Sequence, residues 1–107
     1  MRLVVAAVGR PKGPIADAIG DYEARAARYW PLEVHEVREE PARGGITVDQ
    51  VREREGERLV AKLPAGAVVA ACDERGEAFT SERFADWLRR HREAARDVAF
   101  VIGGAYG

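Results

Sequence analysis

The feature that most constrains the fold is a regular alternation between short strand-like runs and longer segments with helical periodicity. Four such runs and three amphipathic segments follow one another along the chain. Strands separated by helices of this length pair in parallel, because each helix carries the chain back to the start of the next strand. We therefore predict an α/β fold in the order β-α-β-α-β-α-β. Its parallel sheet would have helical crossovers on both faces, which makes three layers.

The predicted strands differ in their hydrophobic pattern. The runs at residues 3–9, 67–72 and 98–102 are apolar throughout, which is typical of strands covered on both faces. The run Leu32–Val37 alternates apolar with polar residues, which predicts a half-buried strand near an edge of the sheet.

The ends of the first two helices have recognisable signals. Pro14 is placed to open the first helix, and Pro31 limits it because the residue before a proline is pushed toward extended geometry. Thr47 and Gln50 have the spacing of a capping box for the second helix, which we expect to continue through Leu63 before a Pro-Ala-Gly stop.

The third helix and two details of the others complete the prediction. Thr80 or Ser81 can cap the third helix. Gly20 inside the first helix costs about 1 kcal/mol relative to alanine, which indicates that something packs closely against it. Residues 53–58 mix both charge signs and are interpreted as a plain exposed helix face. The expected apolar face of the third helix consists of Phe84, Trp87, Leu88 and His91.

Composition limits the class of protein. The 107 residues form at most one domain, so we predict a single α/β domain over residues 1–107. Lys and Arg number 17 against 18 Asp and Glu, and this balance neither requires nor excludes a nucleic-acid partner. Cys72 is the only cysteine, which excludes a disulfide framework and is typical of a reducing setting. With no targeting signal and no apolar run near the roughly 20 residues that span a membrane, we expect a soluble, cytoplasmic protein.

Residues suited to ligand binding follow two of the predicted strands. The sequence Cys-Asp-Glu-Arg-Gly occupies residues 72–76, and Gly-Gly-Ala-Tyr-Gly occupies residues 103–107. Parallel strands place both loops at one edge of the sheet, where open α/β folds bind ligands. Glycine lets the backbone approach a ligand closely, and Asp73 could accept a hydrogen bond from a ribose hydroxyl or an amine. In the alternative interpretation, the glycines only turn the chain and Asp73 is a solvated loop acid.

The remaining polar residues give weaker signals. The chain has no G-x-G-x-x-G fingerprint, no phosphate-loop lysine after Gly104, and no set of residues with metal-ligand spacing, so no metal is expected. His35 and His91 have no partner motif. The cluster of Arg89, Arg90, His91 and Arg92 with Arg96 could contact phosphates, although a solvated helix end is favoured. Cys72 is interpreted chiefly as a small apolar filler at the end of a buried strand.

Three stretches taken together resemble one family. They are RLVVAAVG at residues 2–9, CDERGE with TSERFA at residues 72–85, and FVIGGAYG at residues 100–107. They are similar, in consistent order over essentially the whole chain, to the RlmH-type methyltransferases of large-subunit ribosomal RNA. These enzymes belong to the SPOUT superfamily of knotted α/β proteins. Cys72 stands where the family usually has leucine, and Glu77 where lysine is common.

The resemblance implies an activity, a cofactor and a site. It implies S-adenosylmethionine-dependent methylation of N3 of a pseudouridine in large-subunit rRNA of the assembled ribosome. The family's enzymes act as homodimers, with no metal and no membrane partner. By position, Cys72 and Gly103 match cofactor-contacting residues, and Asp73 and Gly104 are included as their neighbours. No residue is assigned as the catalytic base.

The family's chains continue past the Gly-Gly turn with a segment that completes the pocket, forms the trefoil knot and ends in Pro-Tyr-His. Residues 1–107 would then be the N-terminal part of a SPOUT domain, truncated before the knot, with apolar sheet surface left uncovered. We do not expect these residues alone to form a complete active site. The alternative is a non-catalytic α/β binding or interaction module derived from that fold. A third interpretation, a flavodoxin-like nucleotide-binding domain, has no phosphate loop to support it.

Overall fold

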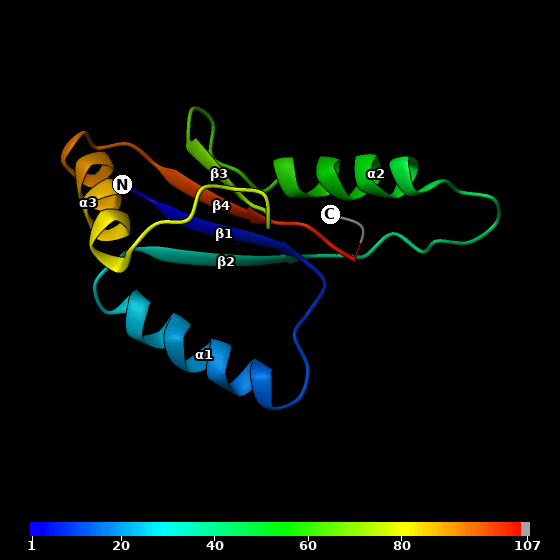
Figure 1. Cartoon of the computed structure of the whole chain (residues 1–107), viewed down its shortest axis with the longest axis horizontal. Coiled ribbons are helices and arrows are strands. Elements are labelled where there is room, and N and C mark those ends of the chain that lie inside the picture. Colours follow the sequence, from blue (N-terminus) through cyan, green and yellow to red (C-terminus); the bar gives the residue numbers. More distant parts are fainter. Residues whose placement is uncertain (106–107) are drawn as a thin grey trace.

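The structure is a computed structural model, and it describes residues 1–105 (Figure 1). It confirms the α/β prediction, with a parallel sheet of four strands and three helices in the predicted order. The elements are β1 (Leu3–Val8), α1 (Pro14–Ala27), β2 (Leu32–Val37), α2 (Val48–Val60), β3 (Val68–Cys72), α3 (Ser81–Glu93) and β4 (Val98–Ile102).

The strands lie in the order β2-β1-β4-β3, so β1 and β4 form the centre of the sheet. Val4, Ala6, Val98 and Ala99 are completely buried there. The edge position predicted for β2 is confirmed. The apolar run at 67–72, however, was expected to be covered on both faces, and β3 is instead the other edge strand, with Val69 51% exposed. An apolar run predicts that a segment forms a strand in a sheet. The position of that strand in the sheet depends on how the crossover helices pack.

The helices cover the two faces of the sheet, as predicted for a three-layer fold. Leu88 of α3 packs against Leu3 and Val98 on one face. Leu59 of α2 packs against Ala6 and Val37 on the other. The two clusters lie on opposite faces of the sheet because successive side chains of a strand point to opposite faces.

Helix α1 lies over the same face as α3 but packs loosely. None of its residues, all of which the structure describes, is buried, and Ile15 and Tyr22 are 63% and 69% exposed. The close packing expected at Gly20 is wrong, since a Cβ built there would meet no described neighbour within 4 Å. A groove of about 670 Å³ separates α1 from the sheet, and its apolar floor consists of Val5, Ala7, Val34 and Ile102.

The capping box of α2 is confirmed in both directions. The Oγ1 atom of Thr47 accepts from the amide of Gln50 at 3.1 Å, and the Oε1 atom of Gln50 accepts from the amide of Thr47 at 2.9 Å. The helix ends at Val60 rather than at Leu63. The amide of Leu63 bonds instead to the carbonyl of Val60 at 3.1 Å. Pro64 explains the difference, because the residue before a proline is disfavoured in α-helical geometry and the last turn tightens.

Helix α3 is capped by Thr80, whose Oγ1 atom accepts from the amide of Arg83 at 3.1 Å. Its aromatic face packs on the sheet, with the ring centroids of Trp87 and Phe100 lying 6.0 Å apart. His91 belongs to the same face, edge-on to Trp87 at 4.5 Å. The predicted apolar side of this helix is therefore confirmed, and it closes the amino-terminal half of the sheet.

Candidate functional site

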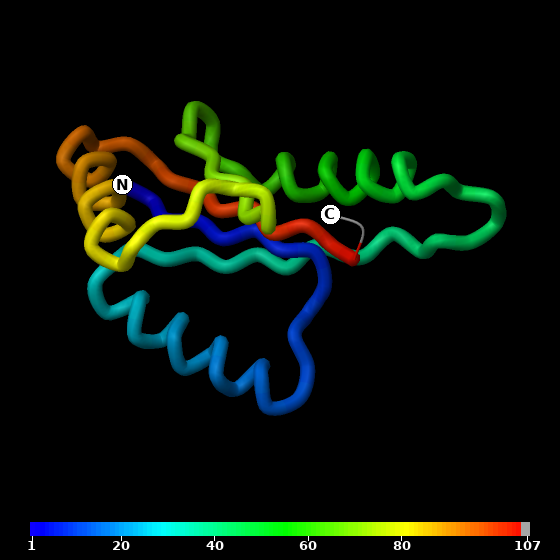
Figure 2. Tube along the Cα trace, in the orientation of Figure 1, coloured from blue at the N-terminus to red at the C-terminus, as the bar shows by residue number. Residues whose placement is uncertain are grey.

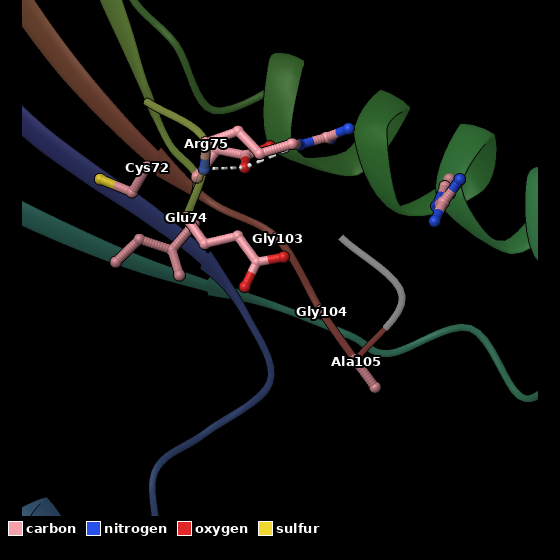
Figure 3. A pocket seen from close by; sticks show the side chains of 9 residues that line it. Cys72, Glu74, Arg75, Gly103, Gly104 and Ala105 are labelled. Atoms are coloured by element: carbon pink, nitrogen blue, oxygen red, sulfur yellow. Dashed lines mark hydrogen bonds and ion pairs between the residues drawn. The ribbon is translucent and has the colours of Figure 1, made fainter. Parts of the chain in front are cut away.

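The two predicted ligand loops meet at the carboxyl edge of the sheet. Because Cys72 pairs with Ile102 in the β3–β4 register, the loops that follow these strands leave the sheet side by side (Figure 3). Together with α2 they line one cleft of about 670 Å³. Its lining residues are Arg52, Cys72, Asp73, Glu74, Arg75, Ile102, Gly103, Gly104 and Ala105.

The cleft includes all four residues that the sequence singled out for cofactor contact, namely Cys72, Asp73, Gly103 and Gly104. They come from two segments about thirty positions apart, and only the parallel pairing of β3 with β4 brings them together. The rest of the predicted glycine loop, Tyr106 and Gly107, lies outside the described residues.

The loop after β3 is a compact turn held by its own side chains. The Oδ1 atom of Asp73 accepts from the amide of Arg75 at 2.8 Å, and the amide of Gly76 donates to the carbonyl of Asp73 at 2.9 Å. The guanidinium of Arg75 also pairs with Asp73 at 3.3 Å. This guanidinium, followed by the amide of Arg75, lowers the pKa of Asp73 below its ordinary value. The cleft therefore has an ionised carboxylate, and Arg75 already uses part of its hydrogen-bonding capacity.

Two further charged residues line the cleft. Glu74 extends its carboxylate from the turn into the space between the two loops (Figure 3). Arg52 comes from α2 and pairs with Asp49 at 3.7 Å. Sequence reasoning did not assign a role to either. Glu74 could have been noticed beside Asp73 in the turn, whereas nothing in the sequence distinguishes Arg52 from the other arginines of α2.

Cys72 does not have the role expected of it. The prediction of a buried apolar filler is wrong, because Cys72 is exposed at the end of an edge strand. Its side chain points away from the glycine turn (Figure 3) and also lines a shallow depression beside Phe79 and Phe84. Its contribution to the cleft is therefore mainly that of its backbone.

Gly104 has a clear steric requirement. A Cβ built on it would lie 2.7 Å from the Oε1 atom of Glu55 and 3.1 Å from Cγ1 of Val8. Both distances are below ordinary van der Waals contact, so the glycine allows the turn to lie directly against α2 and the end of β1.

The interpretation of residues 53–58 as a plain exposed face is wrong at Glu55, because only 6% of this residue is exposed. It lies on the buried stripe of α2, between Val51 and Leu59. The signal was present in the sequence, because positions 51, 55 and 59 are one helical turn apart and only the middle one is charged.

The other oxygen of Glu55 reaches the loop that follows β2. Its Oε2 atom accepts from the amide of Glu40 at 3.0 Å. The carboxylate of Glu40, with a side chain 12% exposed, pairs with Arg58 and, at 3.5 Å, with Arg54. These arginines, Arg58 foremost, lower the pKa of Glu40 below its ordinary value. Figure 2 shows this loop leaving the end of β2 and returning into α2.

Comparison with known proteins identifies the family of this chain. The family described as "Predicted SPOUT methyltransferase" matches the chain over residues 1–107. The chain belongs to the SPOUT methyltransferase family.

Relatives of this SPOUT chain share one name, "Ribosomal RNA large subunit methyltransferase H". The protein of that name from Gemmatimonas aurantiaca is 60% identical over 108 residues, which cover 100% of this chain and 70% of the relative. Its namesake from an Anaeromyxobacter species is 47% identical, with 100% and 69% covered. The one from Syntrophotalea carbinolica is 39% identical, again with 100% and 69% covered. The resemblance to RlmH-type proteins is confirmed.

The remaining candidate residues of this SPOUT chain are not brought to the cleft. His35 lies on β2 beside Glu33, at 3.8 Å. His91 and the arginines of α3 lie on the helix that packs at the amino-terminal ends of the strands, where Arg89 pairs with Asp86 at 2.9 Å. Within residues 1–105, no three His, Cys, Asp or Glu side chains are grouped so as to hold a metal ion. No helix in the same range has the length and apolar character needed to cross a membrane.

Proposed function

We propose that this SPOUT chain serves the S-adenosylmethionine-dependent methylation of N3 of a pseudouridine in large-subunit ribosomal RNA. One observation carries the proposal: Cys72, Asp73, Gly103 and Gly104, chosen from the sequence alone, line a single cleft at the carboxyl edge of the sheet. Support also comes from relatives whose shared name states methyl transfer to large-subunit ribosomal RNA.

The residues of the cleft fit the proposed cofactor. Its volume of about 670 Å³ is within the range of roughly 300–1,000 Å³ typical of small-molecule sites. S-adenosylmethionine carries a sulfonium and an ammonium, and the carboxylates of Asp73 and Glu74 line the cleft. The backbone of the glycine turn offers hydrogen-bonding groups without side chains in front of them.

Such a site works mainly by holding and orienting its reactants. Bound S-adenosylmethionine would supply an electrophilic methyl group. The glycine turn and the Asp73 turn would fix the orientation of the cofactor, and positioning of this kind contributes a large part of a transfer reaction's acceleration. The acceptor nitrogen also has to lose a proton to a base.

The proposal extends to the organisation of the protein. By resemblance to the family, residues 1–107 would form a single α/β domain that corresponds to the N-terminal part of a SPOUT domain. The match covers about 70% of the length of the Gemmatimonas relative. By resemblance to the family, the protein would act in the cytoplasm as a homodimer on the assembled ribosome.

The test is calorimetric titration of the 107-residue chain with S-adenosylmethionine. We expect measurable binding by the unmodified chain, because both loops of the cleft are present, and loss of binding in Gly103→Val, which would add a branched side chain to a residue that lines the cleft. Gly20→Ala is the matched control, because residue 20 lies on exposed helix outside this cleft. Circular dichroism would verify that each variant is folded. Absence of binding by the unmodified chain, or unchanged binding by Gly103→Val, would overturn the proposal.

One observation favours the alternative, a non-catalytic interaction module. The groove beneath α1 has an apolar floor, with Val34 and Ile102 38% and 43% exposed, and contiguous apolar surface is a usual mark of an interface. Light scattering coupled to size exclusion separates the two proposals. Stable oligomers that do not bind S-adenosylmethionine would favour the module, and cofactor binding would favour the methyltransferase.

A further inference from the structure

Glu55 is a buried carboxylate whose place in α2 calls for an explanation. It is 6% exposed and occupies a position where its neighbours on the stripe, Val51 and Leu59, are apolar. Burying a carboxylate is costly unless hydrogen bonds compensate for the lost water. An apolar side chain would fill this position at less cost, so the carboxylate must serve a contact that an apolar group cannot make.

The two oxygens of Glu55 contact two different loops. Oε2 accepts from the amide of Glu40, in the loop after β2. Oε1 lies against Gly104, in the turn after β4, so closely that a Cβ there would be 2.7 Å from it. Val8, at the end of β1, also lies close to this turn, with its Cγ1 atom 3.1 Å from a Cβ built at residue 104. Because the strand order is β2-β1-β4, Glu55 joins loops that leave the sheet on either side of β1.

We propose that Glu55 is a positioning residue, which holds the glycine turn of the cleft against α2 and ties its placement to the loop at residues 38–46. The consequence for cofactor binding rests on the proposed function, whereas the link between the two loops does not. Both contacts are made by one planar carboxylate. Glu55 therefore cannot move away from residue 104 without disturbing its hydrogen bond to Glu40.

This geometry predicts that a substitution at residue 104 changes hydrogen exchange at residue 40, which is 64 positions away in the sequence. In Gly104→Ala the new methyl group would displace Oε1 of Glu55, since 2.7 Å is too short for a carbon–oxygen contact. The displaced carboxylate would lose its bond to the amide of Glu40. Loss of one hydrogen bond should speed hydrogen exchange at that amide by about tenfold.

The experiment is hydrogen exchange followed by nuclear magnetic resonance on the full 107-residue chain. We expect Gly104→Ala to speed exchange at Glu40, and Glu55→Ala to do the same. In the double variant the two effects should not add, because the same bond is already lost. Glu55→Gln keeps one acceptor oxygen and should restore much of the protection. Gly56→Ala is the control, since a Cβ at that neighbouring position meets no described atom within 4 Å.

The outcomes separate this proposal from the proposed function. Unchanged exchange at Glu40 in Gly104→Ala, or additive effects in the double variant, would overturn the link between the loops. If S-adenosylmethionine does not bind the unmodified chain, the proposed function fails while the exchange test still stands. If it binds, Glu55→Ala should weaken binding at least fivefold and Glu55→Gln less. Equal affinity in Glu55→Ala would show that Glu55 does not position the cleft.

Discussion

Arg58 of α2 pairs with the carboxylate of Glu40, and its second guanidinium nitrogen donates to the carbonyl of Arg38 at 3.0 Å. One arginine thus fixes both the side chain and the backbone of the loop that leaves β2. Glu55, one helical turn earlier, holds the amide of Glu40. The same helix therefore carries the contacts to this loop and the carboxylate that lies against Gly104.

The pair of Glu40 with Arg58 predicts a pH dependence of stability. The pKa of Glu40 is below its ordinary value, chiefly because of Arg58, so the pair stabilises the folded state only while Glu40 is ionised. Its contribution is complete above the ordinary glutamate pKa of about 4.3 and is lost as the pH falls through the lower folded-state pKa.

Urea midpoints measured at pH 7, 5, 4 and 3 would check this. Glu40→Gln should lose stability less steeply than the unmodified chain below about pH 5. Glu77→Gln is the control, because its ion pair with Arg83 is exposed and such pairs contribute little. Parallel pH profiles for Glu40→Gln and the unmodified chain would contradict the prediction.

Two adjacent residues of α2 should differ strongly in the effect of truncation on stability. Leu59 is 5% exposed in the cluster with Ala6 and Val37, whereas Val60 is 66% exposed. Leu59→Ala should lower the free energy of unfolding by about 2–5 kcal/mol, and Val60→Ala should change it by less than about 0.5 kcal/mol. Denaturant titration measures both, and equal effects would mean that α2 presents a different face to the sheet.

Two glycines at α1 should respond oppositely to alanine. Gly20 lies within the helix, where alanine is favoured by about 1 kcal/mol, and a Cβ there meets no described neighbour within 4 Å. Gly13 has equal space, but its φ of +71° is a conformation that alanine adopts at a cost of roughly 1–2 kcal/mol. Thermal unfolding should show Gly20→Ala stabilised and Gly13→Ala destabilised. Destabilisation by Gly20→Ala would reveal a contact that the structure lacks.

The thiol of Cys72 should be reactive without contacting the ligand. It is exposed and is the only cysteine of the chain, so one thiol should react with a disulfide reagent in the native protein. Because its side chain points away from the glycine turn (Figure 3), S-adenosylmethionine bound in the cleft should change the labelling rate by less than about twofold. Cys72→Ser should leave affinity within about twofold for the same reason. Strong protection of the thiol by the ligand, or a large loss of affinity in Cys72→Ser, would contradict this placement.

Much of the lining of the candidate cleft could be predicted because its signals are local. A glycine pair directly after a buried strand, and an acidic turn after another, indicate strand ends whatever the order of the strands. Parallel pairing then places both at one edge, and the cleft unites Cys72, Asp73, Gly103 and Gly104 as expected. The exposure of Cys72 was missed because the apolar run that precedes it does not show that β3 is an edge strand.

The residues alone predicted the alternation of strands and helices, the capping box of Thr47 and Gln50, and the family to which the chain belongs, and they left Thr80 and Ser81 as alternative caps of α3. These depend on local propensity, hydrophobic period and motif identity. The folded structure was needed to show that β3 is an edge strand, that α1 leaves an apolar groove, and that Glu55 lies between Glu40 and Gly104. Those features depend on which side chains meet across distant segments, and a charged residue within an exposed-looking run acquires its role only when the chain brings Glu40 and Gly104 to it.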